Sequence, residues 1–311
     1  MSEDKKKSLF KSFLLNTKFD FMGCHKIVIV ISIICIIVSI FLVCWRGLNF
    51  GIDFSGGILI EAKITDKFDL EEIRSTLHKN QIFDVNIQNF DQENIMIRVS
   101  KSKNEDQSLL VKTIQEILNA KFPHIEYRKV DFVGPQVGLE LIKNGFLALF
   151  SSFLAIMIYI SIRFDWQFGL GGIAALFHDA IITFGFFALT GLEFNLTSIA
   201  AVLTIIGYSI NDSVVIYDRV RENLRRFKKM ELTTLLNLSI NSTLSRTILT
   251  SSTILISLIA LILFGGEVLR SFSIATFFGI LIGTYSSIYI SAPILIYIDP
   301  RKKDDKTAIQ N

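Results

Sequence analysis

Four ionisable residues inside or next to long apolar runs are the candidates for chemistry in this sequence of 311 residues. Asp179 interrupts the run 166–192, and Asp212 interrupts the run 194–217. His178 precedes Asp179, and Arg246 directly precedes the run 247–266. An ionisable group inside a bilayer is energetically costly, so each of these residues is a candidate functional residue. The chemistry that such groups support is the uptake and release of a proton.

Asp212 is the sharpest candidate. It lies six residues before Asp218, which places it roughly 9 Å inside the apolar run at the rise of an α-helix. Thr204, Tyr208 and Asn211 precede it at helical spacing, so we expect the acid on a polar face that points into a helix bundle. The alternative is a buried acid with a purely structural role.

Arg246 is the candidate counter-charge of Asp212. It begins a polar stripe that continues through Thr250, Thr253 and Ser257 at helical spacing. Residues 233–245 favour a helix that extends this span beyond the membrane, so Arg246 need not mark its end. Ordinary anchoring of a positive charge at the membrane interface is the alternative.

His178 and Asp179 are the second candidate pair for a proton pathway. Histidine titrates near neutral pH and is a common proton carrier. Adjacent residues on a helix point about 100° apart, so the two side chains need not face one cavity. A relay and a structural role both remain open. Gly279 and Gly283 form a small-x-x-x-small pattern, which is typical of close helix packing.

The apolar runs that carry these residues predict the architecture. Residues 45–143 contain 28 charged residues, whereas the other 212 residues contain 33 in short patches. We predict a polytopic α-helical membrane protein with six transmembrane helices and one external domain between the first two. The expected parts are a cytoplasmic segment 1–26, a first helix 27–44, an external domain 45–143, a five-helix bundle 144–298 (about 144–162, 169–190, 196–217, 245–264 and 271–298) and a cytoplasmic tail 299–311.

The distribution of basic residues predicts the orientation. The segments assigned to the inside hold 18 Lys and Arg, and the outside turns hold only Arg270. The positive-inside rule therefore places both termini in the cytoplasm and residues 45–143 outside. The first apolar core is 18 residues long and no A-x-A site follows it, so we expect an uncleaved anchor.

The external region alternates strand-like and helix-like patterns. Strands are expected at 58–64, 85–89, 95–100 and 125–133, and helices at 70–80 and 106–121. Asp69 is expected to cap the first helix, with Glu72 completing a capping box. The order βαββαβ is the ferredoxin-like, split-βαβ pattern. This region shows no catalytic constellation. The three cysteines of the sequence lie in or beside the first apolar run, and their odd number without C-x-x-C spacing argues against a disulfide framework and a zinc site.

Five ordered motifs resemble the SecD/SecF family of the bacterial Sec protein translocase, which belongs to the RND-type superfamily. The fourth-span motif 205–222, with Asp212, Asp218 and Arg219, is similar to SecF rather than to SecD members. Shorter SecF-like motifs occur at 244–247 and 283–287. The opening signature 47–57 and the re-entry motif 134–138 contribute Gly51, Asp53, Phe54, Gly56, Gly57, Gly134 and Pro135.

The resemblance implies an auxiliary subunit, not an enzyme, that pairs with SecD and uses the proton-motive force to promote export across the bacterial inner membrane. It implies the SecYEG channel as a partner, with YajC and YidC as further candidates, together with the translocating polypeptide and the bilayer. It implies no cofactor and no nucleic acid, and it raises the expectation that Asp212 and Arg246 lie on a proton pathway. Whether protons or sodium ions drive the cycle stays open.

Two other classes of protein are alternatives. Half of an RND-type small-molecule exporter would share the fold, although such exporters carry two halves in one chain. An intramembrane aspartyl protease would use Asp179 and Asp212 as carboxylates that share one proton. Neither acid has a G-x-G-D context, so this class is disfavoured.

Overall fold

The computed structural model describes residues 18–64, 68–82, 85–89, 93–99 and 107–301. The chain divides into two units, Phe50–Leu147 and the pair of segments Met1–Asn49 and Ala148–Asn311. Each unit is described below by itself.

Six helices in the described residues are long and apolar enough to cross a membrane, which confirms the number of predicted spans. Each contains at least one window of 18 residues with high mean hydropathy, because its apolar run continues without charged residues for most of a membrane thickness. The helices are α2 (His25–Arg46), α6 (Pro135–Arg163), α7 (Trp166–Thr190), α8 (Leu196–Arg226), α9 (Leu232–Phe264) and the last span, in which α10 (Gly266–Ser286), a π-helical segment η1 (Ser287–Ser291) and α11 (Ala292–Ile298) follow one another.

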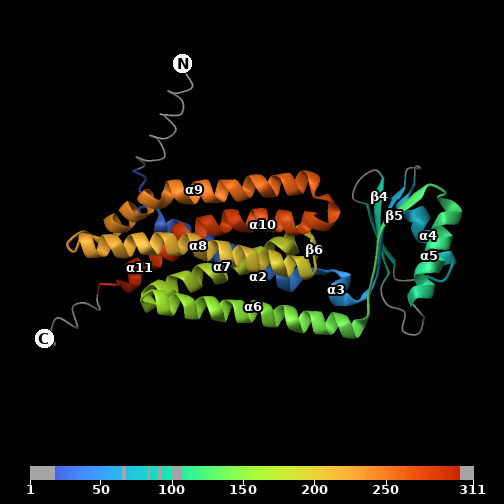
Figure 1. The fold of residues 1–311 in the computed structure, drawn as a ribbon, viewed down its shortest axis with the longest axis horizontal. Helices are drawn as coiled ribbons and strands as arrows, with labels where there is room; N and C mark the ends of the chain where they lie inside the picture. Colours follow the sequence, from blue (N-terminus) through green and yellow to red (C-terminus); the bar gives the residue numbers. More distant parts are fainter. Residues whose placement is uncertain (1–17, 65–67, 83–84, 90–92, 100–106, 302–311) are drawn as a thin grey trace, which may run out of the picture. The chain divides into compact units, whose positions relative to one another are not determined.

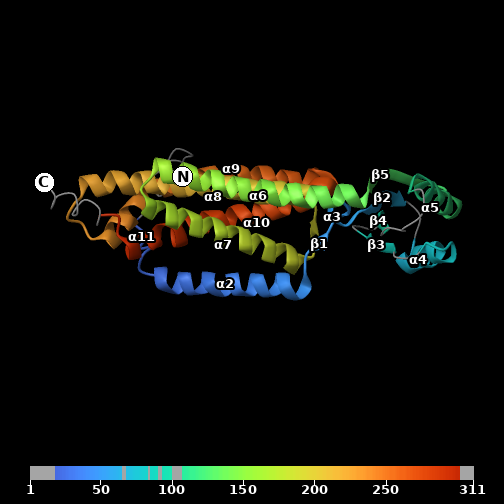
Figure 2. The same cartoon turned by 90° about the horizontal axis from the view of Figure 1, so that it is seen from below.

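The last span and the helices α7 and α8 form the interior of the membrane unit. The apolar windows of these three spans are 61%, 61% and 50% buried, compared with 11%, 17% and 17% for α2, α6 and α9. Helix α2 packs on α7, and α9 packs on α8 and α10 (Figures 1 and 2). Residues on the three interior spans can therefore be shielded from lipid on most sides.

Three helices continue well beyond their apolar runs, and α6 is one of them, because it begins at Pro135 instead of near 144. Helix α8 extends to Arg226 instead of ending near 217, and α9 begins at Leu232, in agreement with the predicted extension of its span through residues 233–245. Residues Leu235, Leu236 and Ile240 of the α9 extension are buried against Ile216 and Val220 of α8. A run of apolar residues identifies only the part of a helix that lies in the lipid. The extensions contain polar and charged residues, so hydropathy alone does not reveal them.

The π-helical segment interrupts the sixth predicted span. A π-bulge has an extra residue per turn and is frequent at functional sites. Here the hydroxyl of Tyr217 on α8 hydrogen-bonds to Ser291 Oγ and donates to Ser291 O at 3.4 Å. A Cβ atom on Gly171 of α7 would lie 2.6 Å from Ser291 O. The π-helical segment therefore binds the buried Tyr217 hydroxyl at a point where only a glycine of α7 leaves enough space.

The second unit contains a four-stranded antiparallel sheet with two helices. Its main elements are β2 (Gly57–Ile64), α4 (Leu70–Lys79), β3 (Val85–Asn89), β4 (Asn94–Val99), α5 (Gln107–Lys121) and β5 (Ile125–Val133). The strand order is β3-β4-β2-β5, and each neighbouring pair is antiparallel. The core between sheet and helices is formed by Ile60, Ile97, Ile73, Leu77 and Ile114. The short helix α3 (Ile52–Ser55) also belongs to this unit, the short strand β1 (Asn49–Phe50) lies at the boundary of the two units, and the short strand β6 (Glu193–Phe194) belongs to the membrane unit.

The start of α4 differs from the predicted capping box. Asp69 caps the helix, and its carboxylate accepts a hydrogen bond from Glu71 N at 3.2 Å. Glu72 instead forms an ion pair with Lys121 of α5, with Nζ and Oε1 2.9 Å apart. The capping-box prediction was therefore wrong, because a non-local basic side chain attracts the carboxylate that local spacing assigned to the helix end.

Tyr127 links β5 to α5. Its hydroxyl donates to Gln115 O at 3.1 Å and to Asn119 Oδ1 at 3.0 Å. Burial raises the pKa of Tyr127 to about 12, because a phenolate loses its hydration there. The side chain consequently remains a neutral donor throughout the physiological pH range.

Candidate functional site

Asp179 is the centre of a hydrogen-bond cluster between the interior helices. Its side chain is fully buried on α7. His178 Nδ1 lies 2.9 Å from Asp179 Oδ1, and Asp179 Oδ2 accepts hydrogen bonds from Ser209 Oγ of α8 and from Ser286 Oγ of α10, the latter at 2.8 Å. Two serine donors from α8 and α10 and the neighbouring imidazole of α7 therefore converge on one carboxyl group, which compensates the cost of burying it.

His178 extends the cluster toward α2. Its ring lies 6.1 Å from that of Tyr285, whose hydroxyl is 2.7 Å from Ser32 Oγ of α2. Within the described residues His178 Nε2 has no hydrogen-bond partner. Although adjacent helical residues diverge by about 100°, the two buried side chains meet directly. The sequence did not identify Ser209, Ser286 or Ser32 as partners, and small polar residues in apolar spans were the available signal.

Asp212 lies one helical turn beyond Ser209 on α8 and is 2% exposed. Among the residues that the structure describes, its Oδ2 atom has no hydrogen-bond partner, and neither has the hydroxyl of the adjacent Ser213. Arg246 on α9 interacts with Asp212 electrostatically. A buried carboxyl oxygen without a hydrogen-bond partner is costly, which keeps Asp212 a candidate for a group whose charge state depends on its neighbours.

The polar face predicted around Asp212 is only partly correct. Thr204 and Asn211 are exposed in this chain instead of pointing into the bundle, whereas Asp212 turns inward with Ser209 and Ser213. Tyr208 lies between the two directions and donates to Ser251 Oγ of α9 at 3.3 Å. Residues that are seven or eight positions apart lie on roughly the same side of a helix, but that side is broad. Packing against the neighbouring helices decides which part of it is buried.

The predicted stripe on α9 is present and faces outward. Arg246, Thr253 and Ser257 are exposed, and Thr250 is half-buried. Each of the three hydroxyls donates to a backbone carbonyl one turn earlier on α9: Thr250 to Arg246 O, Thr253 to Thr250 O and Ser257 to Thr253 O, at 2.8–3.0 Å. The stripe therefore presents polar side chains on a membrane-spanning helix without leaving their donors unsatisfied.

Gly279 and Gly283 are packing residues between α10 and α8. A Cβ atom on Gly279 would lie 2.1 Å from Ile205 Cδ1, and one on Gly283 would lie 3.1 Å from Ser209 Cβ. Because Gly283 adjoins Ser209, this contact also fixes the distance between α10 and the serine that donates to Asp179.

We expect Gly279→Ala to lower the thermal unfolding temperature of the purified chain much more than Gly283→Ala. Overpacking typically costs about 1–3 kcal/mol, and only the Gly279 variant must displace a branched side chain by more than an ångström. Thermal unfolding in detergent measures the difference. Equal unfolding temperatures for both variants and the parent chain would contradict the packing assignment.

The glycine signature after α2 serves local geometry. Gly56 and Gly57 have φ angles of 71° and 121°, which side chains with a Cβ rarely adopt. They end α3, in which Phe54 is buried and Asp53 is half-buried. In the re-entry motif, a Cβ atom on Gly138 of α6 would lie 3.1 Å from Phe54 O. Gly51 precedes α3 as its N-cap, and Gly134 precedes α6.

Asp218 and Arg219 lie beyond the buried part of α8. Asp218 Oδ1 is 3.4 Å from Arg163 Nη2 at the end of α6, and Arg219 forms an ion pair of 2.6 Å with Glu222. Arg219 Nε also donates to Ser242 Oγ of α9 at 3.0 Å. These two motif residues therefore tie the ends of helices together and do not join the buried acids.

The arrangement does not form an aspartyl dyad. Both oxygens of Asp179 are engaged by His178, Ser209 and Ser286, and Asp212 Oδ2 has no partner in the described residues. Two carboxylates that share a proton must contact each other. No group of three or more His, Cys, Asp and Glu side chains that could hold a metal ion occurs in the part of the chain described.

The fold and the site define a polytopic membrane protein whose interior helices bury two acids. A family model described as protein export membrane protein SecD/SecF, C-terminal, matches residues 113–301, and the SecD/SecF GG motif matches residues 46–66. The chain belongs to the SecD/SecF family. Its similarity to relatives named protein translocase subunit SecF confirms the resemblance to the SecF branch and identifies an auxiliary subunit of the Sec translocase.

The relatives match over nearly their whole length. The SecF subunit of Rickettsia conorii is 54% identical over 293 residues, which are 93% of this chain and 94% of the relative. The subunit of Rickettsia bellii is 53% identical over 286 residues, with 91% and 94% covered.

Two solved structures share the fold. The crystal structure of SecDF from Thermus thermophilus, a translocon-associated membrane protein, has a TM-score of 0.81 at 35% identity and is matched over 93% of this chain. SecDF in its super-membrane-facing form has a TM-score of 0.69 at 35% identity, with 94% of this chain covered. The chain spans 40% of the length of either SecDF chain.

Proposed function

We propose that this subunit pairs with SecD and uses the proton-motive force to promote protein export across the bacterial inner membrane. The observation that carries the proposal is Asp212, an acid that is buried on α8, has no hydrogen-bond partner at Oδ2 in the described residues and lies within electrostatic reach of Arg246. Such a group can alternate between a neutral and an ionised state when its neighbour moves.

A change in the distance between α8 and α9 would drive this alternation. Burial favours the protonated acid, and an approaching guanidinium favours the carboxylate. Arginine stays protonated in proteins, so Arg246 acts as a gate for the proton and not as its carrier. His178 and Asp179 form a second candidate pair, because His178 Nε2 is buried and has no partner in the described part of the chain.

The exposed polar groups of α8 and α9 support a membrane partner. Thr204 and Asn211 on α8 and the stripe on α9 would otherwise face lipid, and polar side chains inside membranes favour the interior of a bundle. SecD is the partner that fits, because the solved chain named SecDF contains this fold in 40% of its length. The SecYEG channel, YajC and YidC are further proposed partners.

Residues 45–143 are proposed as a ferredoxin-like domain outside the membrane. The strand order β3-β4-β2-β5 with helices α4 and α5 in crossover positions supports the split-βαβ assignment. The proposed boundaries of the cytoplasmic segments and of the helix bundle remain those of the sequence.

The experiment measures translocation into vesicles that contain SecYEG with this chain and SecD together, or with either alone. We expect a proton gradient to stimulate translocation only when both subunits are present. Equal stimulation by this chain alone would reject the pairing, and no stimulation by the pair would reject proton coupling. Replacing the proton gradient by a sodium gradient identifies the coupling ion.

The proposed orientation gives a separate prediction. In a background without Cys24, Cys35 and Cys44, a cysteine at the exposed Thr190 should react with an impermeant thiol reagent added outside intact cells. A cysteine at the exposed Lys228 should react only after permeabilisation. The 18 inside and one outside Lys and Arg residues motivate this result. The reverse labelling would overturn the assignment of both termini to the cytoplasm.

A further inference from the structure

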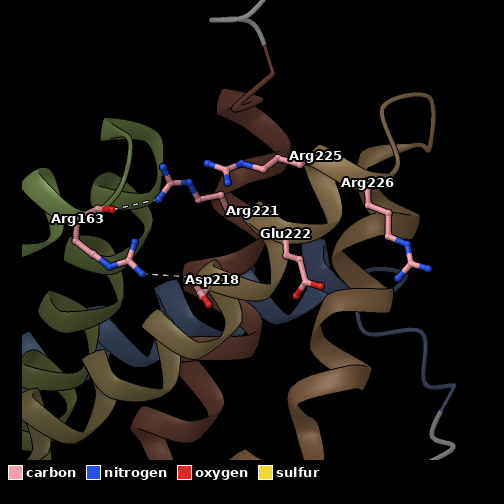
Figure 3. A pocket seen from close by; sticks show the side chains of 6 residues that line it. All are labelled: Arg163, Asp218, Arg221, Glu222, Arg225 and Arg226. Atoms are coloured by element: carbon pink, nitrogen blue, oxygen red, sulfur yellow. Dashed lines mark hydrogen bonds and ion pairs between the residues drawn. The ribbon is translucent and has the colours of Figure 1, made fainter.

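An open cavity of about 520 Å³ lies where α6 and α8 end, on the proposed cytoplasmic side. We name it the arginine pocket after the four guanidinium groups in its wall. The lining residues are Arg163, Asp218, Arg221, Glu222, Arg225 and Arg226. In Figure 3 the side chains of Arg221 and Arg225 extend to the same side of α8 as Arg163, whereas Arg226 extends to the opposite side.

The acids of the pocket are already engaged. Asp218 pairs with Arg163 at 3.4 Å, and Glu222 pairs at 2.6 Å with Arg219, which lies outside the lining. Arg221 donates to a backbone carbonyl, that of Arg163, at 3.4 Å. Among the described residues neither Arg221 nor Arg225 has an ion pair with an acid. The pocket therefore has an excess of positive charge, with guanidinium donors available to an anion.

The residues next to the pocket are of the kinds that contact lipid. Three of the last α6 residues before Arg163 are apolar or aromatic and exposed, namely Ile158, Tyr159 and Ile162, the last 81% exposed. Trp166, three residues after Arg163, is also exposed. Tryptophan is enriched at the membrane–water interface, so Arg163 lies at the depth of headgroups, beside a surface that acyl chains would cover.

We propose that the arginine pocket binds the phosphate group of an anionic phospholipid of the inner leaflet, with the acyl chains along α6. Guanidinium groups bind phosphate oxygens through paired, charge-assisted hydrogen bonds. Basic pockets next to membrane helices on the cytoplasmic side are suited to anionic headgroups. An acidic protein surface would satisfy the same charges, but it would not account for the exposed apolar surface of α6 that continues from the pocket.

The position of Trp166 allows a direct test. The sequence has two tryptophans, and Trp45→Phe leaves Trp166 as the single fluorophore. The chain is reconstituted into bilayers of phosphatidylcholine with increasing phosphatidylglycerol, where one of the two lipids carries brominated acyl chains that quench tryptophan on contact. We expect Trp166 to prefer phosphatidylglycerol over phosphatidylcholine. Arg221→Gln and Arg225→Gln should each lower that preference roughly fivefold (about 1 kcal/mol).

The matched control removes the same charge from elsewhere on the same side. Lys228 and Lys229 are exposed and lie outside the pocket lining, so Lys228→Gln or Lys229→Gln alone, each of which removes one positive charge as each arginine variant does, should leave the preference unchanged. Arg221→Lys with Arg225→Lys keeps the charge but loses the bidentate geometry, and should give an intermediate preference even if the glutamine variants fail to fold.

Four results would overturn the proposal. The first is the absence of any preference for phosphatidylglycerol. The second is an equal loss of that preference in the arginine variants and in the lysine controls, which would show that only the general surface charge matters. Abolition of the preference by inorganic phosphate at constant ionic strength would assign the pocket to a free anion. Loss of a co-purifying protein in the arginine variants, with lipid preference intact, would assign it to an acidic partner.

Discussion

Asp212→Asn should assemble normally yet lose the stimulation of translocation by a proton gradient. The amide has nearly the size of the carboxyl group, and Oδ2 has no hydrogen bond to lose in the described residues, so the bundle should fold with little change in stability. An amide does not bind or release a proton at physiological pH, so the stimulated rate should fall to the rate without a gradient. Gradient-driven translocation in vesicles with matched protein levels measures both rates.

Two further variants test the role of the neighbours. Arg246→Met should also abolish the stimulation, because the carboxylate would then lack the charge that favours ionisation. Asp218→Asn is the matched control: it is the same change on the same helix, six residues later, at a side chain that is 65% exposed. Its effect should be small. Full stimulation in Asp212→Asn would show that this acid is structural.

Asp179→Leu should destabilise the folded bundle. Leucine removes the acceptor of three buried hydrogen bonds, from His178, Ser209 and Ser286. Hydrogen bonds between membrane helices contribute on average about 0.6 kcal/mol each, so the two from Ser209 and Ser286 predict a loss of about 1 kcal/mol, and the lost contact with His178 on the same helix adds to it. That is a measurable share of a typical folding free energy of about 5–15 kcal/mol. Thermal unfolding of the purified chain in detergent measures the loss.

Asp179→Asn separates stability from proton transfer. Its amide keeps an acceptor oxygen for one of the two serines, so it should be destabilised less than Asp179→Leu. We expect the folded variant to show reduced gradient stimulation if His178 and Asp179 form the second proton site. Full stimulation in a stable Asp179→Asn would restrict the proton pathway to Asp212 and Arg246. An unchanged unfolding temperature in Asp179→Leu would contradict the hydrogen-bond cluster itself.

The spans and the buried acids could be predicted because they depend on local composition. A run of about 20 apolar residues crosses the hydrocarbon wherever it occurs, and the six predicted spans correspond to the six apolar helices. An acid inside such a run is rare because placing an ionisable group in the bilayer costs free energy. Asp179 and Asp212 could therefore be identified as candidates from the sequence without knowledge of their contacts. The glycine spacing at 279 and 283 indicated close packing for the same reason, since it is a pattern within one helix.

Tertiary structure alone determined which groups meet. The rotation of α8 about its axis turns Asp212 inward and Thr204 outward, although both fit one polar spacing. Ser209, Ser286 and His178 converge on Asp179 from three helices, and Glu72 leaves its own helix end for Lys121. Hydropathy and periodicity describe one segment at a time, whereas rotation and partner choice depend on the side chains of other segments.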